Sequence, residues 1–157
     1  MNLVKFRPAT SDDLLALVRL LADDQLGATR EDANLPLNPR YVAAFTALQS
    51  DGNQLLLVAE QEKILVGCLQ LSFIPGLTRK GMWRGQIEGV RIAPTHQNQG
   101  LGRRMMEHGI HLCRQRGCEL VQLTTDIRRT DAHAFYEALG FEASHLGFKL
   151  SLPLLSS

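Results

Sequence analysis

The chain has 157 residues and a formal net charge of +1, and its composition is 45% hydrophobic and 21% charged. This size favours one substantial core, so we expect residues 1–157 to form a single domain. The balanced charge gives no reason to expect nucleic acid or an anionic membrane as a partner, and no apolar run approaches the ~20 residues of a spanning helix.

The N-terminal residues and the cysteines bear on the cellular compartment. Lys5 and Arg7 occupy positions where a secretory signal would be apolar. The chain has an odd number of cysteines, Cys68, Cys113 and Cys118, and their spacing is not that of metal ligands. This pattern is typical of reduced thiols that pack as small hydrophobes. We therefore expect a cytoplasmic protein, and we assign no metal site.

The first elements follow from periodicity and capping. Residues 4–7 alternate apolar and charged side chains, which predicts a strand. Thr10 can cap a helix with Asp13 as a capping-box partner, and the following apolar residues recur at helical spacing. Gly27 is expected to end or follow this helix.

Polar residues 28–37 predict a loop, and Asn38 before a first-turn proline predicts a second helix to about Gln49. Beyond it we expect strands at 55–59, 64–74 and 86–93, a helix at 100–116, a strand at 118–124, a helix at 131–139 and a strand at 146–152. The order βααβββαβαβ predicts an α/β fold. Its mixed sheet should be mostly antiparallel early, with at least one parallel crossover late.

The turn between the strand at 86–93 and the following helix is the most informative segment. It reads His96-Gln97-Asn98-Gln99-Gly100-Leu101-Gly102. The first N–H groups of a helix have no internal partner, and the helix dipole favours negative charge there. Gly100 and Gly102 carry no Cβ, so a bulky anion can approach the main chain closely. The turn therefore predicts a phosphate site, although an ordinary strand-to-helix turn remains the alternative.

Two motifs together resemble the GCN5-related N-acetyltransferase (GNAT) family. Residues 97–102 match its phosphate loop, and residues 132–141, which contain Phe135-Tyr136 and end in Gly-Phe, match its late signature. The resemblance covers roughly residues 3–150. Residues 129–136 and Ser144-His145 look like the small-amine branch that contains aminoalkylphosphonate acetyltransferases. The family's usual asparagine after the penultimate strand is absent from residues 124–129.

A glycine at position 89, inside a predicted strand, indicates a bulge or a close backbone approach. The resemblance implies the GNAT fold, in which a bulge here splays two strands and opens a cleft. It also implies acetyl-CoA as cosubstrate, with backbone N–H groups of residues 99–103 on the pyrophosphate. The implied cofactor-binding residues are Val90, Ile92, Gln97, Asn98, Gln99, Gly100, Leu101, Gly102 and Arg103. Arg103 can equally be a solvated helix residue, and the side chains of Val90 and Ile92 are more simply core.

Two residues carry the implied acid–base chemistry. Glu88 precedes the bulge and is assigned as the general base, through a water; the alternative is a structural ion pair with Arg84 or Arg91. Tyr136 matches the family's general acid for the thiolate, and the alternative is a core aromatic beside Phe135. The N–H of Val90 becomes the candidate oxyanion donor.

The sequence thus predicts an acetyl-CoA-dependent N-acetyltransferase for the primary amine of a small molecule. The acceptor is expected at residues 27–37, residues 73–82 and the last strands. The alternatives are a protein or peptide acceptor, a non-catalytic acyl-CoA-binding module, and a regulatory subunit that turns over only with a partner. Exposed strand edges make a homodimer a further expectation.

Overall fold

The computed structural model describes residues 3–155. It divides into two compact units, one up to Leu123 and one from Thr124 onward, which are described in turn.

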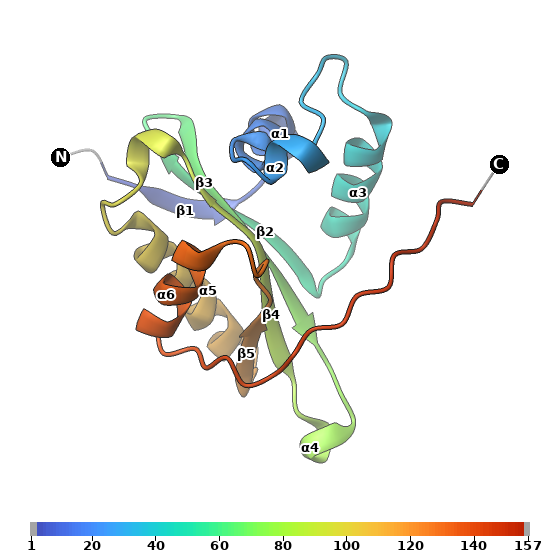
Figure 1. Cartoon of the computed structure of the whole chain (residues 1–157), viewed down its shortest axis with the longest axis vertical. Helices are drawn as coiled ribbons and strands as arrows, with labels where there is room; N and C mark the ends of the chain where they lie inside the picture. Colours follow the sequence, from blue (N-terminus) through green and yellow to red (C-terminus); the bar gives the residue numbers. More distant parts are fainter. Residues whose placement is uncertain (1–2, 156–157) are drawn as a thin grey trace. The chain divides into compact units, whose positions relative to one another are not determined.

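The first unit is built on a mixed five-stranded sheet (Figure 1). Its strands are β1 (Lys5–Pro8), β2 (Gln54–Gln61), β3 (Ile64–Ile74), β4 (Arg84–Ile92) and β5 (Leu120–Leu123), in the spatial order β1-β2-β3-β4-β5. The first four strands pair antiparallel, and β4 pairs with β5 in parallel. The predicted α/β class and mixed sheet are confirmed.

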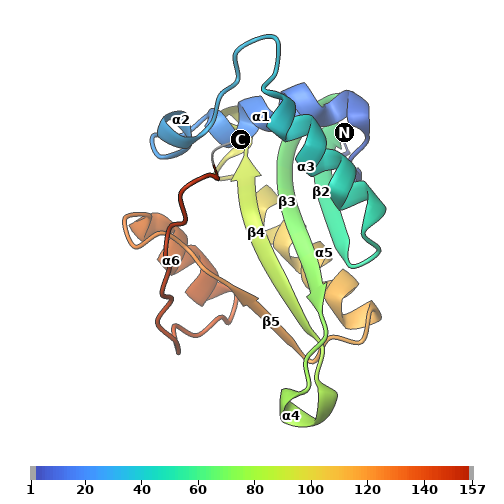
Figure 2. The same ribbon diagram turned by 90° about the vertical axis from the view of Figure 1, so that its right-hand side faces the viewer.

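Helices cover both faces of this sheet (Figure 2). The helices are α1 (Leu14–Ala22), α2 (Gly27–Arg30), α3 (Pro39–Ser50), the short turn α4 (Thr78–Gly81) and α5 (Leu101–Gln115), with 3-10 turns at Ser11–Asp13 and Pro94–His96. Helices α1 and α3 lie on one face and α5 on the other. Gly27 follows the first helix, as expected, but residues 28–30 of the predicted loop belong to α2, where Asp24 accepts the N–H of Gly27.

Side-chain alternation along β3 divides the core between the two faces. Cys68 packs with Leu17, Leu20 and Val58 in the layer under α1. The next residue, Leu69, points toward the opposite face, where its side chain lies close to Gly109 of α5. Burial of each large apolar side chain contributes about 1.5–3 kcal/mol, so both layers stabilise the sheet that carries the site.

Strand β4 contains the predicted bulge. Cys68 pairs with Arg91 and Gln70 pairs with Glu88, so one residue of β3 faces two residues of β4. Gly89, at this position, has a φ of +64°, which a residue with a Cβ adopts only at a cost. Pairing between β4 and β5 ends at Ile87, immediately before the bulge. The bulged and splayed strand pair is therefore confirmed.

The second unit contains α6 (Thr130–Ala138) followed by an extended segment. The predicted strand at 146–152 is wrong, because residues 141–155 form neither helix nor strand. Phe148 is 91% exposed and Leu150 is 87% exposed. Alternation predicts which side chains would share a face, but a strand also needs a neighbouring backbone to pair with.

Candidate functional site

The turn between β4 and α5 is held by its own amide side chains. Gln97 Nε2 donates to the carbonyl of Ile92 at 3.1 Å, and Gln99 Nε2 donates to the carbonyl of Thr95 at 3.2 Å. Asn98 and Gly100 both have positive φ, +60° and +78°. These two left-handed residues reverse the chain, so that α5 begins directly beyond the end of the strand.

The N-terminus of α5 has no side-chain cap. The first N–H that reaches a helical carbonyl is that of Arg104, which donates to Gly100 at 3.1 Å. The first turn contains no acidic residue and no capping side chain. The N–H groups of Leu101, Gly102 and Arg103 therefore have no partner within the helix, and a Cβ at Gly100 would meet open space. This arrangement suits a bound phosphate.

Basic side chains in the first turn of α5 have local partners. Arg103 Nε donates to Glu107 Oε1 at 2.9 Å, one turn along the exposed face. The Arg104 guanidinium lies 5.7 Å above the ring of Phe6, which stacks on His108. The geometry thus agrees with the solvated alternative for Arg103, and its main-chain N–H is the better anion ligand.

In the described part of the chain, the edge of β4 beyond the bulge is not paired with another strand, although the carbonyls of Val90 and Ile92 accept hydrogen bonds from the side chains of Arg91 and Gln97. Ala93 donates its N–H to Val66 of β3 at 2.8 Å. Because main-chain groups alternate along a strand, those of Ile92 and Val90 point toward the opposite edge, which β5 has already left. An amide-rich ligand can pair with such an edge like an added strand.

Glu88 is an exposed carboxylate on the same face as α1 and α3. It pairs in register with Gln70, and directly opposite residues share a face. Arg91, one of its proposed structural partners, instead lies 3.3 Å from Asp24 and donates to the carbonyl of Val90. Within residues 3–155, no ion pair joins Glu88 to Arg84 or Arg91.

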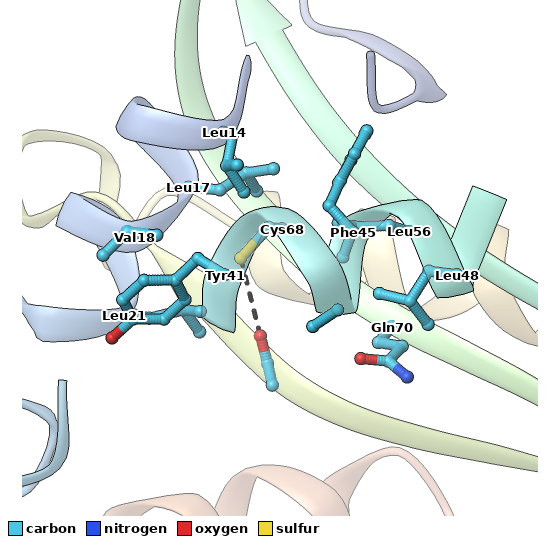
Figure 3. Close-up of a pocket in the computed structure, with 12 residues that line it drawn as sticks. Leu14, Leu17, Val18, Leu21, Tyr41, Phe45, Leu48, Leu56, Cys68 and Gln70 are labelled. Carbon is cyan, nitrogen blue, oxygen red and sulfur yellow. Dashed lines mark hydrogen bonds between the residues drawn. The ribbon is translucent and has the colours of Figure 1, made fainter. Parts of the chain in front are cut away.

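A cavity of about 190 Å³ lies beside the bulge, between α1, α3 and the sheet (Figure 3). Its lining includes Leu17, Leu21, Phe45, Cys68 and Gly89. Sequence reasoning missed this cavity, because it assigned these helix faces to the core and expected the acceptor at residues 27–37, residues 73–82 and the last strands. The signal that could have located it is Gly89, which marks where the strands separate.

The thiol in this cavity is not a nucleophile. Cys68 Sγ donates to the carbonyl of Gly89 at 3.5 Å. Burial raises the pKa of the Cys68 thiol to about 12, so it stays protonated near neutrality. This agrees with its interpretation as a small hydrophobe.

In the second unit, Tyr136 belongs to an aromatic cluster. Its ring meets Phe135 edge-on at 5.3 Å and Phe141 at 6.0 Å, and the N–H of Phe141 donates to the Tyr136 carbonyl at 3.1 Å. The late motif therefore builds a compact C-terminal cap for α6. Packing of the ring is compatible with either role considered for Tyr136, because its hydroxyl lies at the end of the ring.

No three His, Cys, Asp or Glu side chains of the described residues lie together as a metal site would require. The helices within residues 3–155 include none that is long and apolar enough to cross a membrane.

Comparisons with known proteins agree with this geometry. The model of the acetyltransferase (GNAT) family matches residues 16–141. Among curated relatives, the chain is 36% identical over 70 residues to aminoalkylphosphonate N-acetyltransferase of Salmonella typhimurium. The matched segment covers 45% of this chain and 46% of that protein. It is 33% identical over 88 residues to glucosamine 6-phosphate N-acetyltransferase of Trypanosoma brucei brucei, covering 56% and 58%. The chain thus spans about half the length of these curated relatives.

Two solved structures extend the likeness over nearly the whole chain. One is described as a transcriptional regulator from Bacillus halodurans C-125, with 46% identity, a TM-score of 0.93, and coverage of 96% of this chain and 100% of that one. The other is a putative acetyltransferase from Agrobacterium tumefaciens, with 27% identity, a TM-score of 0.82, and coverage of 94% and 99%. The family match, the bulged β4 and the uncapped, glycine-led start of α5 lead to one conclusion: this chain belongs to the GNAT family of acetyltransferases.

Proposed function

We propose that the protein is an acetyl-CoA-dependent N-acetyltransferase that moves an acetyl group directly to the primary amine of a small molecule. The observation that carries the proposal is a strand that bulges at Gly89, frees its edge, and runs into an uncapped helix N-terminus. Such a strand and helix offer N–H groups first to an amide chain and then to a pyrophosphate.

In this proposal the cosubstrate is held mainly by main-chain groups. The turn from Gln97 to Arg103, with Asn98, Gln99, Gly100, Leu101 and Gly102 between them, binds the pyrophosphate. The open edge at Val90 and Ile92 pairs with the pantetheine arm. The side chains of Gln97 and Gln99 hold the turn in shape through their bonds to the main chain.

The proposed chemistry is direct transfer. Glu88, through a water, removes a proton from the incoming ammonium, and the neutral nitrogen attacks the thioester carbonyl. The N–H of Val90 stabilises the oxyanion that forms. The nitrogen of the intermediate gives its second proton to solvent, and the intermediate collapses with cleavage of the C–S bond. Tyr136 gives its phenolic proton to the leaving thiolate and regains a proton from solvent. The exposed carboxylate of Glu88, without an ion pair to Arg84 or Arg91, supports this role over a structural one.

A small-molecule acceptor is favoured over a protein acceptor. The curated relatives carry names of small-molecule acetyltransferases, and the cavity beside Gly89 is small. A non-catalytic acyl-CoA-binding module is the second candidate, and it would have no use for an accessible base beside the bulge.

The deciding experiment has two readouts. A thermal-shift titration measures acetyl-CoA binding, which should raise the melting temperature because a ligand of the folded state stabilises it. Release of the CoA thiol in the presence of a panel of amines measures turnover. Binding with amine-dependent thiol release supports the proposal, whereas binding without release for any amine or peptide would identify a non-catalytic module.

We further propose that residues 1–157 act as one domain, in the cytoplasm, as a homodimer. A single domain is supported by the family match, which crosses the boundary between the two units. A cytoplasmic location is supported by the free thiols of Cys68, Cys113 and Cys118, because reducing compartments favour free thiols. The exposed apolar side chains of residues 146–152 are suited to burial against a second copy. Light scattering of the purified full chain should give twice the monomer mass.

A further inference from the structure

The cavity beside the bulge has a chemistry that limits the acceptor. Its walls are apolar side chains from α1 (Leu14, Leu17, Val18 and Leu21), α3 (Ala44, Phe45 and Leu48) and the sheet. Figure 3 shows the side chains that it labels on α1 and α3 gathered around Cys68. No lysine, arginine or histidine contributes to the lining.

The donor groups of the polar lining side chains, Gln70, Tyr41 and Cys68, each already have an acceptor. Gln70 Nε2 donates to Gln54 at 3.2 Å. The Tyr41 hydroxyl donates to Glu31 at 2.8 Å and accepts the N–H of Asp32 at 2.9 Å, and burial raises the pKa of this phenol. A phosphonate or phosphate placed here would lose its hydration without gaining a cation, which is costly.

Arg7 and Arg91 lie on this face of the sheet, and both have carboxylate partners. Arg7, opposite Val58, pairs with Asp13 and Glu60, and Arg91 pairs with Asp24. Arg91 stands opposite Cys68, next to the cavity. Its buried Nε lies 3.3 Å from Asp24 without making a hydrogen bond, and its Nη1 donates to the carbonyl of Val90 at 2.8 Å. Asp24 also holds the N–H of Gly27, so this pair is part of the connection between α1 and α2. Recruiting Arg91 for an anion would separate it from the Asp24 carboxylate.

The size and position of the cavity indicate what it does hold. A volume of about 190 Å³ compares with the roughly 150 Å³ apolar cavity that holds a benzene molecule. Gly89 lines the cavity. Glu88 precedes Gly89 in β4 and lies on the face of the sheet that carries the cavity, opposite Gln70. A hydrocarbon group in the cavity would thus leave an attached ammonium near the Glu88 carboxylate.

We propose that the acceptor is a primary amine whose other end is an uncharged, apolar group about the size of a phenyl ring. This inference rests on the proposed acetyl transfer and names its substrate class. It sets this chain apart from the relatives named for phosphonate and phosphosugar acceptors. Each methylene added to a straight-chain amine should raise kcat/KM about fourfold until the cavity is full.

The test compares two amines by calorimetry and by turnover on the full chain. 2-Phenylethylamine should bind at least tenfold more tightly than 2-aminoethylphosphonate and be acetylated with a higher kcat/KM. Ala44, exposed on α3, lines the cavity, so Ala44→Phe should fill it and weaken 2-phenylethylamine binding at least tenfold. Ala43→Phe is the matched control, since Ala43 is exposed on the same helix outside the lining and its replacement should change binding less than twofold.

The outcomes separate this inference from the proposed function. Calorimetric binding of 2-phenylethylamine that Ala44→Phe abolishes supports the cavity even if no acetylation follows, and that result would count against the transferase. Acetylation of 2-aminoethylphosphonate with a kcat/KM equal to or above that of 2-phenylethylamine supports the transferase and overturns the apolar acceptor. Equal effects of Ala43→Phe and Ala44→Phe would also overturn it.

Discussion

Glu88 and Gly89 are adjacent in β4, and the backbone conformation of Gly89 determines where the Glu88 side chain lies. The positive φ of Gly89 lets β4 bulge, and the bulge ends the pairing with β5. The carboxylate of Glu88 therefore stands at the point where the strands part, on the face that carries the apolar cavity. In the proposed mechanism, this position makes the carboxylate accessible to an amine that occupies the cavity.

Replacement of Glu88 by glutamine should slow the reaction by about 10² at a pH well below the pKa of the acceptor amine. The deficit should shrink as the pH rises toward that pKa, because a neutral amine needs no base. The measurement is a pair of kcat/KM profiles against pH, for wild type and Glu88→Gln, with Glu119→Gln as an exposed control. Parallel profiles would assign Glu88 a role other than that of the base.

Replacement of Tyr136 by phenylalanine removes one hydroxyl and keeps the ring in its cluster with Phe135 and Phe141. If Tyr136 protonates the thiolate, turnover should fall by about 10² or more. The thermal shift with acetyl-CoA should stay the same, since the packing is retained. Wild-type turnover in Tyr136→Phe would make the residue a core aromatic.

At the scale of elements, the start of α5 is the clearest case of local structure that suits the proposed cosubstrate site. A negative charge at a helix N-terminus stabilises the helix, and glutamate has a higher helix propensity than glycine. Gly102 lies in the first turn of α5, without the positive φ of Gly100. A substitution at Gly102 therefore tests the anion site without straining the turn.

Gly102→Glu should keep or raise the melting temperature of the unliganded protein and abolish the increase that acetyl-CoA causes. The introduced carboxylate repels the pyrophosphate and occupies its N–H groups. Differential scanning fluorimetry with and without acetyl-CoA measures both effects. His111→Glu, on the exposed face farther along α5, is the control and should retain the shift. A normal shift in Gly102→Glu would remove this turn from the cosubstrate site.

Arg7 ties β1 to the start of α1 and to β2. Its guanidinium donates to both carboxylate oxygens of Asp13, at 2.7 and 2.9 Å, and to Glu60 at 2.9 Å. Asp13 Oδ2 also accepts the N–H of Thr10 at 2.7 Å, which confirms the expected capping pair. The hydrogen bond from Arg7 lowers the pKa of Asp13, against the opposing effect of burial.

This lowered pKa gives the stability a defined pH dependence. A carboxyl whose folded pKa lies below its unfolded value of about 3.9 contributes fully above that value, and its contribution is lost as the pH falls through the folded pKa. Asp13→Asn should therefore lower the free energy of unfolding by about 1–2 kcal/mol at pH 7, and the difference from wild type should narrow below about pH 4. Urea denaturation at pH 7 and pH 3 measures this, with exposed Asp12→Asn as the control. A constant difference at both pH values would contradict it.

At the scale of the whole molecule, a single domain requires the two units to unfold together. If residues 1–157 form one domain, calorimetry should give a single transition whose calorimetric and van't Hoff enthalpies agree. The single tryptophan, Trp83, reports on the first unit, while far-ultraviolet circular dichroism reports on both units. Coincident curves from the two probes are expected. Two separate transitions, with Trp83 following one of them, would contradict a single domain.

Much of the fold could be predicted because it depends on neighbours in sequence. Asn38 accepts the N–H of Arg40, and α3 begins at Pro39 and ends at Ser50, close to the predicted limits. The start of α5 follows from Gly100, and the bulge follows from Gly89, since each requires a positive φ. Capping and backbone sterics act within a few residues, so a local pattern is enough to reveal them.

The tertiary structure alone decided the features that join distant segments. The apolar cavity takes its walls from α1, α3 and three strands, and Glu88 faces the same side because the register places it opposite Gln70. The alternation at residues 146–152 is as regular as that of a true strand, yet these residues form none, because pairing needs a second backbone that the pattern does not contain. Side-chain periodicity is a property of the chain, whereas register, cavities and strand pairing are properties of contacts between separate parts of it.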